Sequence, residues 1–488
     1  MKFISWTRPI AFVSLCFMAC SSLSAQSIGF SSQSTTGNTI GAATPNKPVH
    51  VYYSDPVKGT KNGDGSAARP WGSLSSMISQ GLINGQDNTT GVVHAGDLVY
   101  LLSGDHGTIY LDNYHGKFVN TDFITIQAAP NNVPVIDQII ASNVSKWVFR
   151  GITISQLNPL GGQYFFLVRV SGSKNMIFDS NTVCSIADAS KWTPANWASL
   201  AVFSGMSFDC TSATITNNVV KNVENGISIS GDGIILKSNV VDSFANDGID
   251  FTASNAIIQN NSVTNHYGQW NDGYHHDGMQ GWTNNGLITN NVLIDSNIIM
   301  ASTGAYPTIP PEPTGAGNDY LQGLSIFDGT WNNLTITNNL VVACAYHGLS
   351  MYGISNSVIA NNTVINESSD PNAATWLGVF AHSGLPISNV IVRNNIANNF
   401  QLSSQGVIDD HNIALTGNNV WSNAKTETIV TDPTKIFVKY QKPTAGYDFH
   451  LISGSPAIGA GTSTYAPKLD ITGKTRNTRR MDIGAYSY

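Results

Sequence analysis

The chain has 488 residues with a formal net charge of −7, and only 11% of its residues are charged. Disorder is excluded because disordered chains combine high net charge with few hydrophobic residues, whereas 41% of this chain is hydrophobic. The 24 Lys and Arg residues are spread along the sequence and do not form the basic surface that nucleic-acid binding requires.

The N-terminus has the pattern of an export signal. Basic residues precede an apolar run over residues 10–19, which is too short to span a membrane, and small residues follow up to Ala25. We expect cleavage after Ala25 and a secreted or periplasmic protein, with lipidation of Cys20 as the alternative. No later segment is apolar enough for a membrane span.

A short motif recurs through the middle of the chain, in which alternating apolar residues are followed by polar residues, an Asn and then Val, Ile or Leu. The repeated asparagines are Asn181, Asn218, Asn239, Asn261, Asn291, Asn339, Asn362, Asn395 and Asn419. A Gly that begins a second alternating stretch lies upstream of most of them, at Gly226, Gly248, Gly278, Gly323, Gly348 and Gly378. The distance from Gly to the next Asn is nearly constant, whereas the distance from Asn to the next Gly varies widely.

This repeat predicts an all-β fold, a right-handed parallel β-helix with insertions on one side only. Its minimum period is about 22 residues, as between Asn239 and Asn261. Each rung has three short strands and pairs with the next rung about 4.8 Å along the axis. The repeated Asn residues are predicted to occupy tight turns in left-handed geometry and to stack as a hydrogen-bonded ladder.

The ends of the chain depart from the repeat. We expect a signal peptide over residues 1–25, a flexible Ser/Thr/Gly-rich linker over 26–48, the β-helix over 49–430 and a C-terminal cap over 431–488. An amphipathic stretch over residues 74–82 is predicted to plug the N-terminal end, because terminal rungs need caps.

Three cysteines remain after the signal is removed: Cys184, Cys210 and Cys344. They are too few for a disulfide framework. We expect isolated buried thiols that behave as small hydrophobic residues. A bridge between Cys184 and Cys210 is the alternative.

The largest insertions all precede the same strand of the repeat, so they are predicted to wall a groove beside one sheet. Their aromatic side chains are candidates either for stacking on sugar rings or for packing the loops: Trp192, Trp197, Tyr267, Trp270, Tyr274, Tyr306 and Tyr320.

Alternation along that strand predicts which side chains point into the core and which into the groove. Ile249, Met279, Leu324 and Leu349 should point inward. The outward columns should contain Asp250, Gln280, Ser325 and Ser350, then Trp282, Phe327 and Tyr352 two residues later, and Asn225, Asp247, Asp277, Gln322 and His347 just before the glycines.

Three carboxylates, Asp247, Asp250 and Asp277, are thereby predicted to meet on adjacent rungs beside His275 and His276. Like charges this close are unfavourable unless a shared proton or a cation relieves them. Such a cluster is suited to acid–base chemistry or to Ca²⁺, which prefers oxygen ligands. Ligation of a transition metal by the His residues, or turns capped by Asp with no chemistry at all, are the alternatives.

The segment over residues 63–71, the Asn repeat and the C-terminal residues 482–486 resemble secreted proteins of the pectate-lyase-like β-helix superfamily. Members of this superfamily include polysaccharide lyases, glycoside hydrolases, epimerases and non-catalytic adhesins or tailspikes. The resemblance therefore implies the fold and only suggests the chemistry.

The function we expect is cleavage of a uronate-containing polysaccharide by β-elimination. His276 or His275 would be the base, and Tyr274 would donate a proton. The uronate charge would be neutralised by Ca²⁺ at Asp247, Asp250 and Asp277, or else by Arg169. The predicted substrate-binding residues are Arg169, Tyr274, Gln280, Trp282, Tyr320, His347 and Tyr352. The partner is the polysaccharide, no organic cofactor is expected, and we expect a monomer.

Two other functions stay open. This chain has residues in common with the motifs of polygalacturonase-like hydrolases, namely Asn246, Asp247 and Gly248, then Asp277, and then His347 followed by Gly348. However, His276 stands where those enzymes have an Asp, and their Arg-x-Lys motif has no clear match here. A non-catalytic glycan-binding or adhesive β-helix is the third possibility, although polar and aromatic residues concentrate in only a few rungs.

Overall fold

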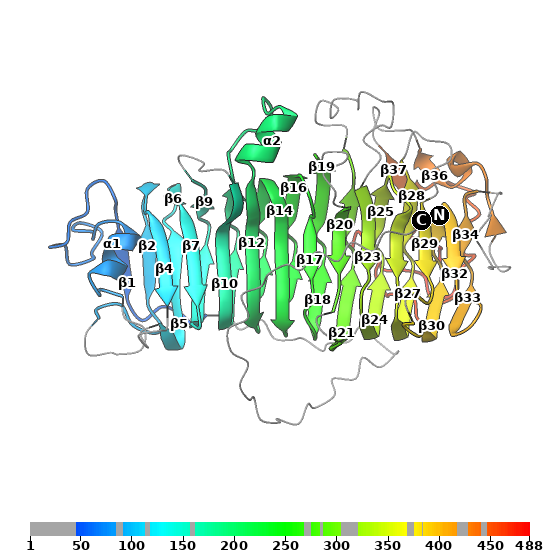
Figure 1. The fold of residues 1–488 in the computed structure, drawn as a ribbon, viewed down its shortest axis with the longest axis horizontal. Coiled ribbons are helices and arrows are strands. Elements are labelled where there is room, and N and C mark those ends of the chain that lie inside the picture. Colours follow the sequence, from blue (N-terminus) through cyan, green and yellow to red (C-terminus); the bar gives the residue numbers. More distant parts are fainter. Residues whose placement is uncertain are drawn as a thin grey trace.

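The structure of the protein is a computed structural model that describes residues 45–83, 91–112, 118–156, 162–267, 275–283, 286–303, 321–367, 375–382, 384–416, 428–440 and 447–488. It is a right-handed parallel β-helix, an elongated solenoid along which successive rungs lie side by side (Figure 1). Three faces of parallel strands run along its axis. We call them faces A, B and C.

Face A contains the strands that follow the insertions, each paired in parallel with the next. They are β4 (Thr108–Asp112), β7 (Gln138–Ser142), β10 (Gly162–Asp179), β12 (Val202–Thr211), β14 (Val219–Asp232), β17 (Ile249–Phe251), β20 (His276–Gly281), β23 (Leu321–Ile326), β26 (His347–Met351), β29 (Trp376–Val379) and β32 (Asn399–Leu402).

Face B follows face A within each rung, and the end of β10 belongs to it. Its other strands are β1 (Val51–Ser54), β2 (Leu98–Leu101), β5 (Val119–Ala128), β8 (Ser145–Arg150), β13 (Thr214–Thr216), β15 (Ile235–Lys237), β18 (Ala256–Gln259), β21 (Ile288–Asp295), β24 (Thr330–Thr337), β27 (Ile354–Ala360), β30 (Ser388–Arg393) and β33 (Val407–Asp410).

Face C completes the rung and shares the start of β14. Its other strands are β3 (Gly104–Asp105), β6 (Pro134–Ile136), β9 (Thr153–Ile154), β11 (Thr182–Cys184), β16 (Val240–Phe244), β19 (Ser262–His266), β22 (Ile298–Met300), β25 (Leu340–Ala343), β28 (Thr363–Asn366), β31 (Ile396–Ala397), β34 (Ile413–Ala414) and β35 (Thr428–Ile429).

The core is a continuous column of apolar side chains inside the solenoid. The predicted inward residues Ile249, Met279, Leu324 and Leu349 pair in register from rung to rung, and each is fully buried. Cys184, Cys210 and Cys344 are buried and form no disulfide, which confirms the prediction of buried thiols over the Cys184–Cys210 bridge. None of the helices in the described part of the chain is long and apolar enough to cross a membrane.

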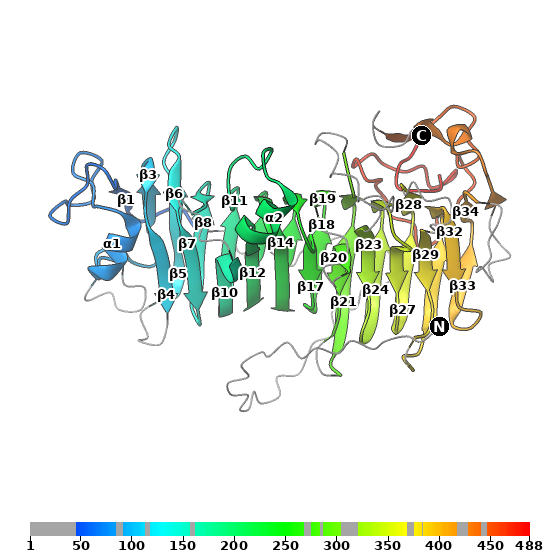
Figure 2. The same cartoon turned by 45° about the horizontal axis from the view of Figure 1, so that its top comes forward.

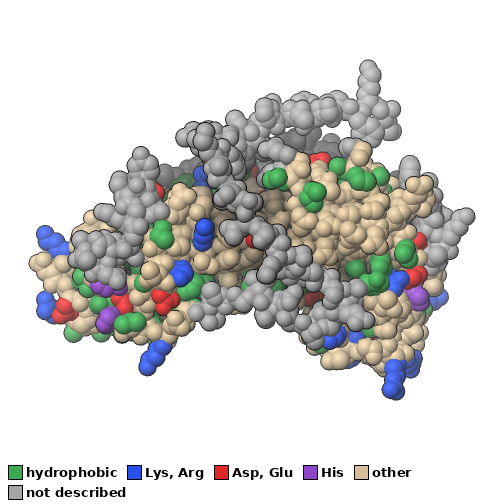
Figure 3. Space-filling view, turned by 90° about the horizontal axis from the view of Figure 1, so that it is seen from below, with side chains coloured by type: hydrophobic (Ala, Val, Ile, Leu, Met, Phe, Trp, Pro, Cys, Tyr) green, Lys and Arg blue, Asp and Glu red, His purple; other side chains and the backbone are tan. Residues whose placement is uncertain are grey.

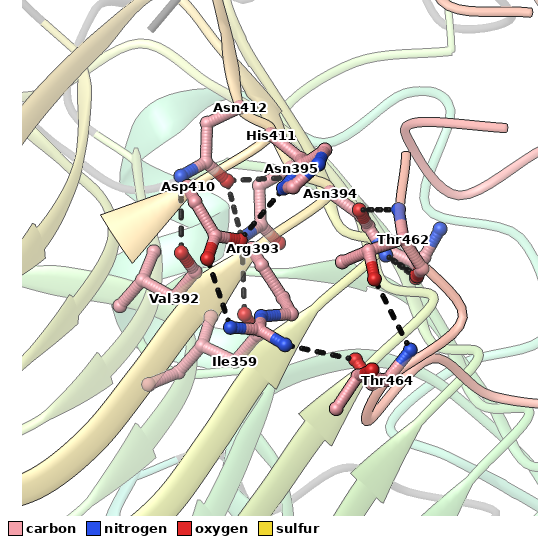
Figure 4. Close-up of polar contacts among 11 residues, drawn as sticks. Ile359, Val392, Arg393, Asn394, Asn395, Asp410, His411, Asn412, Thr462 and Thr464 are labelled. Carbon is pink, nitrogen blue, oxygen red and sulfur yellow. Dashed lines mark hydrogen bonds and ion pairs between the residues drawn. The ribbon is translucent and has the colours of Figure 1, made fainter. Parts of the chain in front are cut away.

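The predicted asparagine ladder is present at the turn before face C. Its members are Asn181, Asn218, Asn239, Asn261, Asn297, Asn339, Asn362, Asn395 and Asn412, all at most 1% exposed. The Nδ2 group of Asn239 donates to Oδ1 of Asn261 at 3.0 Å and to the carbonyl of Ile215 at 2.9 Å, and the backbone N–H of Asn239 donates to the same Oδ1. Figure 4 shows the same pattern at Asn395.

Two details of the ladder differ from the sequence prediction. Asn297 takes the place predicted for Asn291, which stacks with Asn255 and Asn333 at another turn, and Asn412 is the last member, whereas Asn419 lies outside the described residues. The left-handed residue is the one before each ladder Asn, as at Asn260, which has φ 56°. The ladder side chain thus points inward while its predecessor makes the turn.

Face A begins at a column of glycines, where the chain turns out of face C. A Cβ atom on Gly323 would overlap the carbonyl oxygen of Gly348 and a methyl group of Val341. Gly226 and Gly248 are confined in the same way by the next rung and by a face C valine. The glycines that mark the repeat are therefore required by close backbone packing.

The N-terminal end is covered as predicted. Helix α1 (Leu74–Ser79) places Leu74 and Met77 in the main core, and it lies beside β1 at the end of the solenoid (Figure 1). Trp71 of the segment over residues 63–71 also enters this core, and its Nε1 donates to the carbonyl of Gly63 at 2.8 Å.

The C-terminal residues 447–488 leave the repeat of parallel strands. They pack along the outer side of face C (Figure 2), where Phe449 and Ile483 join the apolar cluster on β25, β28, β31 and β34. Arg476 reaches back to Oδ1 of Asn338 at 2.7 Å, and Asn394 accepts from the backbone of Thr462 (Figure 4). A short 3₁₀ helix (Pro433–Lys435) and an antiparallel pair, β36 (Phe437–Lys439) with β37 (Asp448–Leu451), connect to this segment.

We expect Asn261→Leu to lower the free energy of unfolding by about 1–3 kcal/mol, because the N–H groups of Asn239 lose their acceptor inside the core. Denaturant unfolding followed by circular dichroism measures the change. The matched control is Asn332→Leu, in a half-buried side-chain ladder where water replaces the lost partners, and we expect a loss below about 1 kcal/mol. Equal losses would show that the buried ladder has no special role.

We expect Gly323→Ala to destabilise the protein by about 1–3 kcal/mol, because the added methyl group has no space between adjacent rungs. The thermal unfolding midpoint measures this effect. Gly72→Ala is the control, since the nearest atom to its Cβ would be 3.7 Å away. An unchanged midpoint for Gly323→Ala would contradict the packing explanation.

Candidate active site

Parallel register on face A aligns the polar residues that the sequence predicted to meet. Asp250 pairs with Gln280, Gln280 with Ser325, and Ser325 with Ser350. Asp277 pairs with Gln322, and the backbone N–H of Asp277 donates to Oδ1 of Asp247 at 2.8 Å. The register therefore aligns these members of two of the three predicted columns, and the acidic residues lie on adjacent rungs.

His275 and Asp277 form a pair at the start of β20. His275 Nδ1 lies 2.8 Å from Asp277 Oδ2, and the His275 side chain is 56% exposed whereas that of Asp277 is 0% exposed. The hydrogen bond to Asp277 raises the pKa of His275 above its ordinary value, against the effect of partial burial. An exposed imidazole backed by a buried carboxylate is an arrangement suited to proton transfer.

Asp250 lies on β17, one rung before Gln280. Burial, followed by the charge of Asp277, raises the pKa of Asp250 to about 7, while the nearby His275 opposes the rise. Its Oδ1 atom is buried and has no hydrogen-bond partner among the described residues. A carboxyl group that is partly protonated near neutral pH can donate a hydrogen bond to an anion.

Asp247 lies just before Gly248 and β17, next to Asn246 and close to Asn225 of the preceding rung. Asn246 donates to Asp247 Oδ2 at 3.3 Å and to Oδ1 of Asn225 at 2.8 Å. Burial, then the charges of Asp250 and Asp277, raise the pKa of Asp247 well above its ordinary value, and the hydrogen bond from the Asp277 backbone opposes them. Asp247 thus supports the turn into β20 through the bond from the Asp277 backbone, while burial disfavours its charged form.

His276 lies on the inner side of the same turn. It is 1% exposed, its Nδ1 is 3.2 Å from Oδ1 of Asn246, and its ring is 4.8 Å from that of His266. Burial, then the neighbouring His276, hold the pKa of His266 well below its usual range. Of the two adjacent histidines, His275 is the one exposed to solvent.

The donor atoms fit Ca²⁺ in part. Oδ1 of Asp250 and Oδ1 of Asp277 are buried carboxylate oxygens without a hydrogen-bond partner in the described structure, and Ca²⁺ prefers such ligands. However, the described residues contain no group of three or more His, Cys, Asp or Glu side chains placed to hold a metal ion. Two carboxylates are therefore available to a cation, and a complete protein site is not formed by these residues.

Arg169 lies on face A but away from the acidic cluster. The register runs from Arg169 through Ser207 and Ser228 to Asp250, which is three rungs or roughly 14 Å. Arg169 is exposed, and its guanidinium lies 4.9 Å from the ring centre of Phe166. It can contact a long polymer on this face but not the atoms that contact His275.

The remaining predicted binding residues divide into three groups. Gln280 and Trp282 are half-buried at and just beyond the end of β20. His347 and Tyr352 lie on the later rungs, where Tyr352 OH is 3.3 Å from His347 Nε2. Tyr274 and Tyr320 lie outside the described residues.

The aromatic residues of the first insertion pack against one another. Helix α2 (Pro194–Leu200) projects over β12 and β14 (Figure 1), and Trp197 stacks on Tyr267 with ring centres 4.7 Å apart. Trp192 meets Trp197 edge to face at 4.9 Å. These three side chains hold the insertion to the solenoid, whereas Trp270 and Tyr306 lie outside the described residues.

Charged side chains are sparse around the cluster. Strands β17, β20, β23 and β26 contain no Lys or Arg, and in Figure 3 most of the charged side chains in view lie toward the ends of the molecule. Sequence reasoning missed Asp328, whose charge contributes to the raised pKa of His275, as well as Trp376, Phe380 and His382. Phe380 continues the predicted column of Phe327 and Tyr352, so extending that column by one rung would have found it.

Comparison with known proteins gives the same fold. A family model described as "Right handed beta helix region" matches residues 204–364. None of the curated proteins matches this sequence. The family match agrees with the right-handed parallel β-helix of the structure.

Several solved structures are similar to this chain, among them these three. The pectate lyase Pel9A is 15% identical over 92% of this chain and 98% of its own, with a TM-score of 0.46. The lacto-N-biosidase GH136 from Eubacterium ramulus is 13% identical over 75% of this chain and 63% of its own, with a TM-score of 0.41. The mannuronan C-5 epimerase AlgE6 A-module of Azotobacter vinelandii is 12% identical over 68% of this chain and 89% of its own, with a TM-score of 0.40.

We expect Asp277→Asn to lower the pKa of His275 toward or below 6.5, because the hydrogen bond to the Asp277 carboxylate is the largest cause of its rise. Titration of the imidazole protons by NMR measures this shift. Asp209→Asn changes an exposed face A residue three rungs earlier and should leave the His275 titration unchanged. A His275 signal that does not respond to Asp277→Asn would contradict the pairing.

Proposed function

We propose that this chain is a polysaccharide lyase that cleaves a uronate-containing polymer by β-elimination. The observation that carries the proposal is the His275–Asp277 pair, in which the two side chains lie 2.8 Å apart, His275 exposed and Asp277 buried. Beside this pair lies the Asp250 carboxyl, whose pKa is raised to about 7. Together they supply a base and a neutral hydrogen-bond donor on one face of the solenoid.

In this mechanism His275 removes the proton from the carbon next to the uronate carboxylate. The electron pair of that C–H bond forms a carbon–carbon double bond, and the bond from the adjacent carbon to the glycosidic oxygen breaks. The leaving oxygen takes a proton, which the imidazolium of His275 can return to it. Asp277 holds the ring and stabilises its charge between the two transfers.

Removal of this proton requires that the negative charge of the uronate carboxylate be offset. Asp250 in its protonated form can donate a hydrogen bond to that carboxylate, and Gln280 lies beside it on the next rung. Burial likewise raises the pKa of Asp247 and so disfavours its charged form. An acidic polymer can therefore approach three aspartates without full charge repulsion.

Ca²⁺ is the alternative source of positive charge. Asp250 and Asp277 would hold it through their two unpartnered oxygens, and when bound it would offset the uronate charge. Activity that is lost in chelator and restored by Ca²⁺ would favour this version, and full activity in chelator would favour the protonated carboxyl.

A glycoside hydrolase is the second candidate. It is favoured by the absence of Lys and Arg from β17, β20, β23 and β26, since a neutral glycan needs no cation. Two carboxyl groups in different protonation states are the usual acid and base of such enzymes. We also propose export through the signal over residues 1–25, which lies outside the described residues.

We expect His275→Ala to reduce turnover of the uronate polymer by about 10²–10⁴-fold in a chain that still folds, because the His275 side chain is 56% exposed. Ultraviolet absorbance of the new double bond measures turnover. His450→Ala is the control, because His450 is also 56% exposed and lies 2.6 Å from an Asp carboxylate far from the site. Equal activity of the two variants would exclude His275 as the base.

We expect a bell-shaped pH dependence with its maximum near neutral pH. His275 acts as a base when unprotonated, and its pKa is raised above 6.5, so activity rises with pH on the acid side. Asp250 acts when protonated, with a pKa of about 7, so activity falls above that value. Asp250→Asn keeps the hydrogen-bond donor and should remove the alkaline fall. An optimum at acidic pH would instead favour the hydrolase.

A further inference from the structure

A second cluster on face A lies beyond the acidic residues, in and around β23, β26 and β29. It consists of Phe327, Tyr346, Tyr352, Trp376, Phe380 and His382 around the buried His347. We propose that this aromatic cluster is a binding subsite for an uncharged sugar ring of the polysaccharide, an inference that rests on the proposed function for the identity of the polymer.

The rings form a connected surface. Tyr352 lies 4.4 Å from Phe327, 4.7 Å from Phe380 and 4.7 Å from His382, on which it stacks. Tyr346 lies 5.5 Å from Trp376. Tyr346 is 50% exposed, and Trp376, Tyr352 and Phe380 are half-buried, so ring faces remain accessible. Aromatic rings with polar edges can bind the apolar C–H face of a pyranose and hydrogen-bond its hydroxyl groups.

A hydrogen-bond network fixes these rings in place. Trp376 Nε1 donates to Ser350 Oγ at 3.1 Å, and Ser350 Oγ is 3.0 Å from His347 Nδ1. The other ring nitrogen of His347 is 3.3 Å from Tyr352 OH. A neutral His347 ring has one N–H, which donates to one of these two hydroxyl oxygens, and one nitrogen that accepts from the other hydroxyl. The hydroxyl that receives the N–H, on Ser350 or Tyr352, therefore keeps its own hydrogen to donate elsewhere.

The cluster is suited to an uncharged ring. Strands β23, β26 and β29, with the residues that follow them up to 329, 353 and 382, contain no Lys or Arg. Burial, then the nearby His275 and His382, lower the pKa of His347 to about 3, so its ring is neutral at physiological pH. Burial, then Tyr346 and then the charge of the exposed Asp328, raise the pKa of Tyr352. The Asp328 carboxylate would repel a uronate bound here.

The cluster is continuous with the proposed catalytic residues. Ser350 lies three rungs from Asp250 through Gln280 and Ser325, which is roughly 14 Å. One polymer chain lying along face A can therefore contact both. A uronate at His275 and an uncharged sugar at Trp376 define a substrate in which the two kinds of ring occur in the same chain.

Calorimetric titration tests this inference. The protein titrated is the full chain with the inactivating substitution His275→Ala, so that the probes bind without being cleaved. The probes are tetrasaccharides from hyaluronan and from rhamnogalacturonan, in which uronate alternates with an uncharged sugar, and tetragalacturonate, in which every ring is charged. We expect at least one alternating probe to bind more tightly than tetragalacturonate, and Trp376→Ala and Tyr346→Ala each to weaken that binding at least tenfold. Tyr110→Ala, an exposed face A tyrosine near the N-terminal end, should leave it unchanged.

The inference is overturned if tetragalacturonate binds best, if no alternating probe binds, or if Trp376→Ala and Tyr346→Ala both leave affinity within twofold. Tyr346→Ala guards against misfolding, because Tyr346 is exposed while Trp376 supports the network. Binding is measured without cleavage, so a chain that binds these probes but forms no unsaturated product would fail the proposed function and leave the subsite standing.

Discussion

The hydrogen bonds between successive rungs determine where every side chain on this molecule lies. Backbone pairing and the buried asparagine ladder hold residues about one rung apart in sequence at a constant spacing. Asp250 and Gln280, which are 30 positions apart, become neighbours only because Ile249 pairs with Met279. A slip of one residue would turn each outward column into the core.

The same constraint explains the electrostatics of the acidic cluster. Strand pairing places Asp247, Asp250 and Asp277 on adjacent rungs whatever their charge, and burial then disfavours three ionised carboxylates. The structure relieves this with a hydrogen bond from the Asp277 backbone to Asp247 and with the His275–Asp277 pair. A carboxyl with a pKa of about 7 in a chain with so few charges marks these rungs as chemically distinct.

Sequence patterns predicted the regular part of the fold well, because each rung repeats the same alternation of inward and outward side chains and the same asparagine turn. The inward residues Ile249 and Leu324 and the half-buried Asp250 follow from alternation, whereas Ser325, which was expected to face the groove, is fully buried. Asn291 was misassigned because two different turns of each rung contain Asn, and only the hydrogen bonds distinguish the ladder residue Asn297 from it.

The candidate site was predicted as a group of residues, but their roles needed the structure. The turn from face C into face A at Gly278 interrupts simple alternation, so His276 is buried beside His266 and His275 is exposed. Trp197 and Tyr267 were equally compatible with sugar binding and loop packing, and only their stacking decides for packing. Pairs of this kind depend on contacts between segments that sequence spacing does not define.

Mass spectrometry of the products formed from a uronate-containing polymer tests the central claim most directly. Elimination adds no water, so each cut should release a fragment one water lighter than a hydrolytic product, with an unsaturated uronate at its non-reducing end. The account predicts this fragment from the unaltered protein and its loss in His275→Ala. Saturated fragments that carry the added water would contradict it.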